Sequence, residues 1–457
     1  MRPGTTTIDP APAAPAVELA PPAGLAAAVS RASLLANFSW VLAGRIAYIA
    51  AQWGVLVVLA RWGTPEVVGQ YGLALALTAP AFMLAQLGLR DLYTTERDAE
   101  SFPTYLALRL LSLAGALAVA AVVAVSGRYS AAVAAVIVGV AGCKAVEGVS
   151  DLLYAPMQRG ERMEFMGRSF VFRGLLSVSA AAAAMYATRS LVAAVLAMLA
   201  AWTVVMVLYD LPSARRVLPA SVALRPAWNA PAIRAVAWMS LPLGGVALLG
   251  SLQSNTGRYL LELFSDRASL GYFTAVAATV GSLDIINLAM TRTALSRLGA
   301  VYRSELGAFQ RELLKLGAFG ALVGVLGLAG GALLGRTLLT LAYGKAYGDA
   351  AGVLLWLLAG RIAVFMYTYI KAAQVVMRQL RAQLAVSAAS SALGFAAGLL
   401  IVPRYGIAGA AMSVALTQWL ALGIGSAGLA LSFSRVAAER DAGAADPPGP
   451  PAAASSS

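Results

Sequence analysis

Long apolar stretches recur along most of this chain, separated by short polar connections. Each stretch has about 18–28 residues, enough for an α-helix to cross roughly 30 Å of hydrocarbon. The pattern predicts twelve membrane-spanning helices, at about 34–60, 68–89, 105–126, 130–154, 170–187, 190–211, 235–263, 269–295, 313–341, 350–375, 382–402 and 406–433. Because the connections are short, no sizeable domain is expected outside the membrane.

The two ends of the chain have a different composition. Residues 1–30 are rich in Ala and Pro and lack a basic segment leading into an apolar core, which favours a disordered tail over a signal peptide. Residues 434–457 are also of low complexity and predict a second disordered tail. A basic, proline-broken segment at 212–234 predicts a linker between an N-terminal lobe, 31–211, and a C-terminal lobe, 235–433.

Composition excludes several classes of protein. Of 457 residues, 60% are hydrophobic and 12% are charged, whereas a soluble domain has about 25% charged residues. The chain has no His and one Cys, Cys143, which disfavours a His base, a His or Cys metal site and a disulfide framework. No cofactor or metal is therefore expected. The net charge of +13 is spread between apolar runs, so we expect it to flank a membrane rather than to bind nucleic acid.

Lys and Arg alternate in abundance from one connection to the next. One side of the predicted membrane carries twenty of them: Arg2, Arg31, Arg90, Arg97, Arg159, Arg162, Arg168, Arg215, Arg216, Arg225, Arg234, Arg292, Arg297, Arg303, Arg311, Lys315, Arg378, Arg381, Arg435 and Arg440. The other side carries six: Arg61, Arg128, Arg189, Arg267, Lys345 and Arg404. Because basic residues concentrate on the cytoplasmic side, we predict a multi-pass protein of the bacterial inner membrane with both termini in the cytoplasm.

The two halves of the chain resemble each other. The segment VLARWGTPEVVGQYGLALAL at 58–77 aligns with YLLELFSDRASLGYFTAVAA at 259–278, at an offset of 201 residues. At this offset Tyr71 matches Tyr272 and Gln52 matches Gln253. Two six-helix halves in the same orientation are typical of transporters that hold a substrate between two lobes.

Several segments resemble a known family in order along the chain. They are LARWGTPEVVGQYGLALALTAPAFMLAQLGLRDL, SLPLGGVALLGSLQSNTGRYLLELFSDRASLGYFTAV, LLTLAYGKAYGDAAGVLLWLLAG and IVPRYGIAGAAMSVAL. Together they are similar to the polysaccharide-biosynthesis flippases, which belong to a superfamily with multidrug exporters and the lipid II flippase. The resemblance implies an all-α membrane fold of two pseudo-symmetric six-helix bundles in a V. It also implies translocation of an undecaprenyl-diphosphate-linked oligosaccharide from the inner to the outer leaflet.

Charged residues deep in the predicted helices are the candidate functional residues. Each costs about 2.5–3.5 kcal/mol at a helix centre, so it normally faces a cavity or a partner. The deep set is Arg45, Lys144, Glu147, Arg258, Glu262, Asp284 and Arg361. Near the helix ends, Arg109, Asp151, Arg173 and Lys371 are expected to reach towards the membrane surface instead.

These residues have both functional and structural interpretations. Arg45, Arg258, Arg361 and Lys144 could line a cationic cavity and bind the diphosphate of a lipid-linked substrate, since guanidinium groups form paired hydrogen bonds with phosphate. Alternatively, Lys144 could pair with Glu147, and Arg258 with Glu262, on one helix face. Asp284, Glu147 and Glu262 could couple an ion or serve as structural partners. Gln52, Gln253 and Asn255 could bind sugar hydroxyls or join helices.

Two other functions compete with a flippase. An ion-coupled multidrug or metabolite antiporter would need an acidic cavity for cationic drugs, whereas the first helix carries Arg45 and no acid. A membrane enzyme acting on lipid-linked sugars would need a catalytic acid or base, commonly in a large outer loop, and the outer loops here are short. We therefore predict a non-enzyme with a lipid-linked oligosaccharide substrate, surrounded by membrane lipids. Polysaccharide polymerases and glycosyltransferases are candidate partners, in an O-antigen, capsule or exopolysaccharide pathway.

Overall fold

The computed structural model describes residues 31–95, 102–302 and 306–444. Within these ranges the regular structure is helical: α1 (Arg31–Trp62), α2 (Pro65–Gln86), α3 (Leu89–Thr95), α4 (Phe102–Ser126), α5 (Ala131–Arg159), α6 (Met163–Thr188), α7 (Leu191–Val205), η1 (Met206–Asp210), α8 (Leu211–Val217), α9 (Ala230–Phe264), α10 (Arg267–Gly281), α11 (Asp284–Tyr302), α12 (Leu306–Tyr343), η2 (Lys345–Ala350), α13 (Ala351–Val376) and α14 (Leu380–Ala444). The predicted tail 1–30 and most of the tail 434–457 lie outside the described residues, and α14 continues to Ala444.

The number of spans agrees with the sequence prediction. Eleven helices in the described ranges are long and apolar enough to cross a membrane, and the last of these, Arg381–Ser434, has 54 residues. It contains Gly406 with φ 52° and ψ −127°, a non-helical conformation that glycine adopts readily. The break separates the two last predicted spans, 382–402 and 406–433. The chain is therefore an all-α, multi-pass membrane protein.

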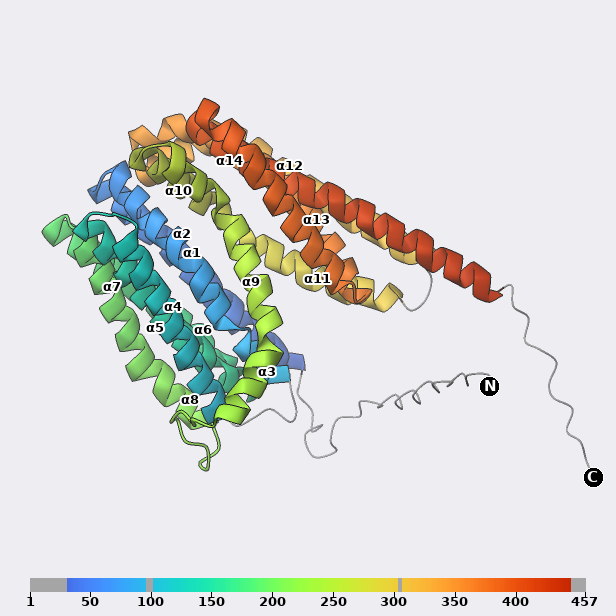
Figure 1. Ribbon diagram of the computed structural model, residues 1–457, viewed down its shortest axis with the longest axis horizontal. Coiled ribbons are helices and arrows are strands. Elements are labelled where there is room, and N and C mark those ends of the chain that lie inside the picture. Colours follow the sequence, from blue (N-terminus) through green and yellow to red (C-terminus); the bar gives the residue numbers. More distant parts are fainter. Residues whose placement is uncertain (1–30, 96–101, 303–305, 445–457) are drawn as a thin grey trace, which may run out of the picture.

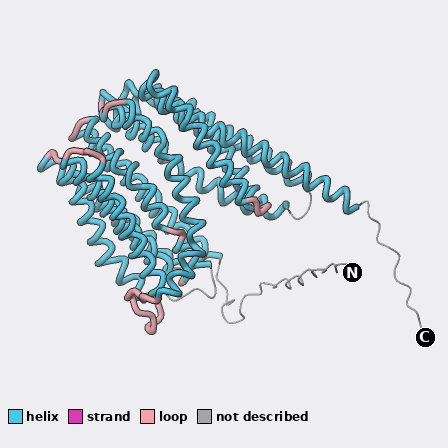
Figure 2. The backbone as a smooth tube through the Cα atoms, viewed as in Figure 1, coloured by secondary structure: helices cyan, strands magenta, loops and turns pink. Residues whose placement is uncertain are grey.

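The helices form two arms in a V. Figure 1 shows α1, α2 and α4–α8 in one arm and α11–α14 in the other, with the arms converging near α10. They diverge towards the side where α1 begins and α14 ends. The loops gather at the ends of the arms (Figure 2), as expected for helices that cross a membrane.

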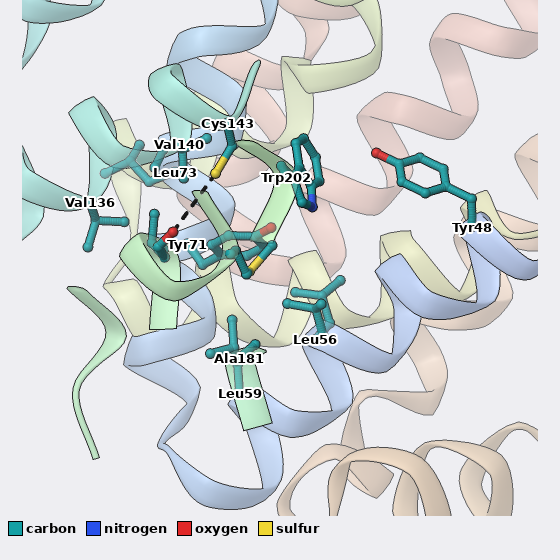
Figure 3. Packing of buried hydrophobic residues seen from close by; sticks show 14 of the residues in the cluster. Tyr48, Leu56, Leu59, Tyr71, Leu73, Val136, Val140, Cys143, Ala181 and Trp202 are labelled. Carbon is teal, nitrogen blue, oxygen red and sulfur yellow. Dashed lines mark hydrogen bonds between the residues drawn. The ribbon is translucent and has the colours of Figure 1, made fainter. Parts of the chain in front are cut away.

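The buried core explains why the arms meet at one end only. The largest cluster of buried residues includes Val55 of α1, Tyr71 of α2, Val276 of α10 and Tyr343 of α12, so it joins both arms. Figure 3 shows Tyr71 in this cluster beside α1, α5 and α7 residues of the first arm. A second cluster belongs to α11–α14 alone. The boundaries of the lobes at 211 and 235 stay a prediction.

Glycines let α2 and α10 touch backbone to backbone at the closed end. A Cβ atom on Gly69 would lie 2.0 Å from the Arg267 carbonyl oxygen, and one on Gly271 would lie 1.8 Å from the Pro65 carbonyl oxygen. The two contacts are reciprocal, as a pseudo-two-fold relation between the halves requires. The equivalent residues of the two contacts, Pro65 with Arg267 and Gly69 with Gly271, are 202 positions apart, one more than the offset found by sequence alignment.

Candidate functional site

Two neighbouring cavities open inside the first arm and towards the second. The smaller, of about 240 Å³, is lined by Arg45, Ala79, Phe82, Met83, Gln86, Arg90, Lys144, Glu147, Asp151, Tyr154, Phe170 and Arg173. The larger, of about 710 Å³, shares Arg45, Arg90 and Phe170 with it and reaches Leu288, Ala289 and Arg292 of α11. Because α11 belongs to the other arm, the larger cavity lies between the arms at their open end.

Arg45 is the predicted site residue that lines both cavities. Its guanidinium carbon lies 5.3 Å from the centre of the Phe170 ring, and the side chain is exposed to the cavity. Among the described residues, the structure records no hydrogen bond or ion pair to Arg45. In the part of the chain that the structure describes, Arg45 is therefore a cation in a membrane-spanning helix without an acidic partner.

Lys144 also lines the smaller cavity, and it forms the same-helix pair that its spacing indicates. Its Nζ lies 2.9 Å from Glu147 Oε2. The other oxygen, Glu147 Oε1, accepts a hydrogen bond of 3.0 Å from the hydroxyl of Tyr48 on α1. Glu147 is thus a structural partner in this conformation. One of its oxygens binds Lys144 on the same helix, α5, and the other binds Tyr48 on α1.

Arg90, Arg109 and Asp151 form a second ion-pair group beside it. Arg90 Nη1 lies 2.9 Å from Asp151 Oδ1, and Arg109 Nη2 lies 3.4 Å from Asp151 Oδ2. Arg109 is fully buried and also donates to the Ala85 carbonyl oxygen. The expectation that Arg109 reaches the membrane surface is therefore wrong, because an acid on the neighbouring helix holds it inside.

Arg173 is buried by the same mechanism. Its Nη2 lies 2.9 Å from Asp210 Oδ2, and both side chains are almost fully inaccessible. Asp210 ends η1, a π-helical turn between α7 and α8, and its Oδ1 accepts a hydrogen bond from Ser169. Such turns insert a residue into a helix and redirect the side chains around it. The surface position expected for Arg173 is thus also wrong, since Asp210 on another helix is its partner.

Arg258, on α9, is not among the residues that line the two cavities. Arg258 Nη1 donates to Asn255 Oδ1 at 2.8 Å, and Nε donates to Thr274 Oγ1 of α10 at 3.4 Å. Asn255 is itself buried and donates to the Ser251 carbonyl oxygen. The structure describes both Arg258 and Glu262 and records no ion pair between them. Here Arg258 and Asn255 join α9 to α10.

Arg361 on α13 pairs with Asp284 at the start of α11. The Arg361 side chain is 17% exposed and the Asp284 side chain 57% exposed, so water reaches the pair mainly from the acidic side. The alternative that Asp284 is a structural partner for a cation on a neighbouring helix fits this geometry. Arg361 is not among the residues that line the two cavities.

Neither glutamine of the predicted sugar site lines the two larger cavities. Gln52 lines a small cavity of about 20 Å³ inside the first arm with Tyr71, Cys143, Lys144 and Trp202, among others. Its Nε2 is buried and has no hydrogen-bond partner among the described residues. Gln253 is half-buried on α9. Their proposed role in sugar binding stays a prediction.

The site residues that sequence reasoning missed are Arg90, Asp151, Arg173 and Asp210. Asp151 and Arg173 were expected near helix ends, Arg90 was expected in a connection, and Asp210 was not considered, whereas the partner of each lies on another helix. Spacing within one helix carries no signal for such pairs. In the described residues, no group of three or more His, Cys, Asp or Glu could hold a metal ion.

Comparisons with known proteins find similarity over most of the chain. No family model matches it. It is 24% identical over 391 residues to the capsular polysaccharide biosynthesis protein CapF of Staphylococcus aureus, which covers 85% of this chain and 97% of that protein. The fold is similar to that of the lipid II flippase MurJ, with a TM-score of 0.63, 8% identity and 88% and 87% of the two chains covered. It is also similar to an inward-facing multidrug MATE transporter, with a TM-score of 0.61, 13% identity and 87% and 95% coverage.

These similarities confirm the resemblance found in the sequence. The chain is similar in sequence to a capsular polysaccharide biosynthesis protein, and it has the fold of MATE transporters and MurJ, two helix bundles in a V.

Proposed function

Starting from the resemblance to polysaccharide flippases, we propose that this protein moves an undecaprenyl-diphosphate-linked oligosaccharide from the cytoplasmic to the outer leaflet of the bacterial inner membrane. The observation that carries the proposal is Arg45, which lines both cavities inside membrane-spanning helices and has no hydrogen bond or ion pair with any described residue. A cation at the centre of a membrane-spanning helix costs about 2.5–3.5 kcal/mol, which an anionic substrate in the cavity would offset. A diphosphate offers two groups that accept paired hydrogen bonds from a guanidinium.

The charge of the two cavities supports an anionic substrate. Their lining includes six basic residues and four acidic ones: Arg45, Arg90, Lys144, Arg159, Arg173 and Arg292 against Asp91, Glu147, Asp151 and Glu161. The smaller cavity would hold the diphosphate, and the larger one, nearer the open end, would hold the sugars. A cationic drug would meet an excess of positive charge, which disfavours the antiporter alternative.

Transport would proceed by alternating access. The arms diverge on the side where α1 begins, and the excess of Lys and Arg assigns that side to the cytoplasm (Figure 1). In this conformation the substrate would enter from the cytoplasm. Rocking of 31–211 against 235–433 about the closed end would then expose it to the outside. The protein would act as a carrier with no catalytic residue and no cofactor. Glycosyltransferases would make its substrate, and a polymerase would use the oligosaccharide after transport.

The test is glycan display at the cell surface, normalised to flippase abundance, for Arg45→Lys, Arg45→Ala and Arg45→Glu. We expect display to fall in that order, because Lys keeps the charge without the fork of donors and Glu repels the substrate. A charge-assisted hydrogen bond contributes about 1.5–3 kcal/mol, so Arg45→Ala should lower affinity roughly 10- to 150-fold. Arg128→Ala, which removes an exposed Arg in a loop at the closed end, is the matched control. Near-normal display from Arg45→Ala would reject diphosphate recognition by this residue.

A further inference from the structure

Two carboxylates on α5 each contact a cation in the cavity with one oxygen and a buried hydrogen-bond donor with the other. Glu147 gives Oε2 to Lys144 and Oε1 to the buried hydroxyl of Tyr48. Asp151, one helical turn further, gives Oδ1 to Arg90 and Oδ2 to the fully buried Arg109. Residues four apart lie on the same helix face, and both carboxylates line the smaller cavity. The same arrangement thus occurs twice, side by side.

The inner donor of each carboxylate is fixed, whereas the outer cation is accessible. Tyr48 is buried and Arg109 is completely inaccessible. The side chains of Lys144 and Arg90 are 29% and 28% exposed. Either cation could therefore turn towards a ligand in the cavity while its carboxylate kept a hydrogen bond to the inner donor.

Both outer cations have donors to spare. A lysine ammonium has three N–H groups, and the structure records one acceptor for Lys144 among the described residues. The Nε of Arg90 is buried, has no hydrogen-bond acceptor among the described residues and lies 3.8 Å from Asp91 Oδ1. The spare N–H groups of Lys144 could bind a phosphate oxygen in the cavity, and Arg90 could do so once its guanidinium turns away from Asp151.

We propose that Glu147 and Asp151 are internal counter-anions: they hold Lys144 and Arg90 when the cavity is empty, and the diphosphate displaces them from those cations. This rests on the proposed function and adds to it a role for the acids. The pairs stabilise the empty carrier, which would otherwise leave cations unpaired in the membrane. They also compete with the substrate, so binding stays weak enough for release on the other side. The two acids thus lower the affinity for the substrate, which permits its release and turnover.

The experiment measures binding of farnesyl diphosphate to the purified full chain in lipid nanodiscs by calorimetry, with farnesol as the uncharged probe. Glu147→Gln keeps the shape and frees Lys144, so we expect about tenfold tighter binding of farnesyl diphosphate than in the wild type. The double variant Lys144→Gln/Glu147→Gln should return to within about twofold of the wild type. Glu164→Gln removes an acid that pairs with Arg162 outside the cavities, and it should change nothing.

A second variant tests the other carboxylate if Glu147→Gln does not fold. Arg109→Met/Asp151→Asn removes the charge of Asp151 and of its buried partner, and it leaves Arg90 with Asp91 at 3.8 Å as its remaining acid, so binding should again tighten. Unchanged or weaker binding in the variants that fold, with wild-type binding lost in Arg45→Ala, would reject the counter-anions and leave the proposed function standing. If the wild type bound farnesyl diphosphate no better than farnesol, diphosphate recognition would fail, and the counter-anion proposal would fail with it.

Discussion

Arg61, at the end of α1, donates a hydrogen bond of 2.9 Å from Nε to the carbonyl oxygen of Ala342, 281 positions away at the end of α12. Its Nη2 also donates to the carbonyl oxygens of Thr340 and Leu341. The last carbonyls of a helix lack partners within the helix and carry partial negative charge. One guanidinium from the first arm thus caps a helix of the second arm at the closed end.

This contact must break if the arms separate there during transport. We expect Arg61→Gln, which lacks the charge and most of the donors, to shift the population towards arms that are open at this end. The measurement is the distance between spin labels at Ala187→Cys and Ala346→Cys, two exposed positions at the closed end, in a Cys143→Ala background. A longer-distance population should grow several-fold in the variant, since capping contributes about 0.3–1 kcal/mol or more.

Arg128→Gln provides the control for the loss of an exposed Arg at the same end of the molecule. It should leave the distance distribution as in the wild type. Identical distributions for Arg61→Gln and Arg128→Gln would show that the Arg61 contact does not hold the arms together.

The buried pair of Arg173 and Asp210 predicts a stability effect of a different kind. Arg173→Met leaves the Asp210 carboxylate buried beside Ser169 without its cation, and breaking such a pair costs about 3–5 kcal/mol. Folded protein, measured by fluorescence-detected size exclusion, should fall strongly in Arg173→Met and in Asp210→Leu. The double variant Arg173→Met/Asp210→Leu should recover most of it, because no unpaired charge remains. If the double variant gave as little folded protein as the single variants, loss of the ion pair would not be the cause of the loss of folded protein.

The sequence predicted the spans well because crossing a membrane imposes a length and an apolar composition on each helix separately. It also predicted the pair of Lys144 and Glu147, since their spacing on one helix brings them together. Such properties can be read without knowing which helices are neighbours.

Contacts between helices were harder to predict. Arg109, Arg173 and Arg361 each pair with an acid on another helix, and hydropathy gives the depth of a residue but not the direction it faces. The alternative pair of Arg258 and Glu262 has suitable spacing, yet Arg258 is turned towards Asn255 and Thr274. Helix packing decided these partners.

Membrane orientation follows from the charge of the connections and can be tested directly. Single cysteines at the exposed positions Arg162 and Arg225 should be protected from an impermeant maleimide in intact cells, in a Cys143→Ala background. Cysteines at the exposed positions Arg128 and Lys345 should react. Permeabilised cells serve as the control, in which all four should be labelled. Labelling of the first pair in intact cells would reverse the orientation, and with it the proposed direction of entry.

A charge swap at the pair of Arg361 and Asp284 distinguishes a structural role of Arg361 from a role in substrate binding. Arg361→Asp places two acids together between α11 and α13, so abundance and normalised glycan display should both fall. The swap Arg361→Asp/Asp284→Arg restores opposite charges, and a purely structural pair should then recover at least about half of both, because such pairs contribute modestly when partly exposed. Recovery of abundance without display would instead assign Arg361 to the substrate.

The contact of α2 and α10 at Gly69 and Gly271 predicts that even a methyl group is too large there. A Cβ on Gly69 would lie 2.0 Å from a backbone oxygen, which cannot rotate away as a side chain can. We expect Gly69→Ala to lower the thermal midpoint of the purified protein, at a cost of about 1–3 kcal/mol for overpacking. Gly115→Ala on α4, where a Cβ meets nothing within 4 Å, should leave the midpoint unchanged or slightly raised. Because Gly69 and Gly271 share one contact, the double variant Gly69→Ala/Gly271→Ala should cost less than the sum of the two single variants. Equal midpoints for Gly69→Ala and Gly115→Ala would mean that the helices separate freely at this point, and that Arg61 and the shared core hold the closed end without it.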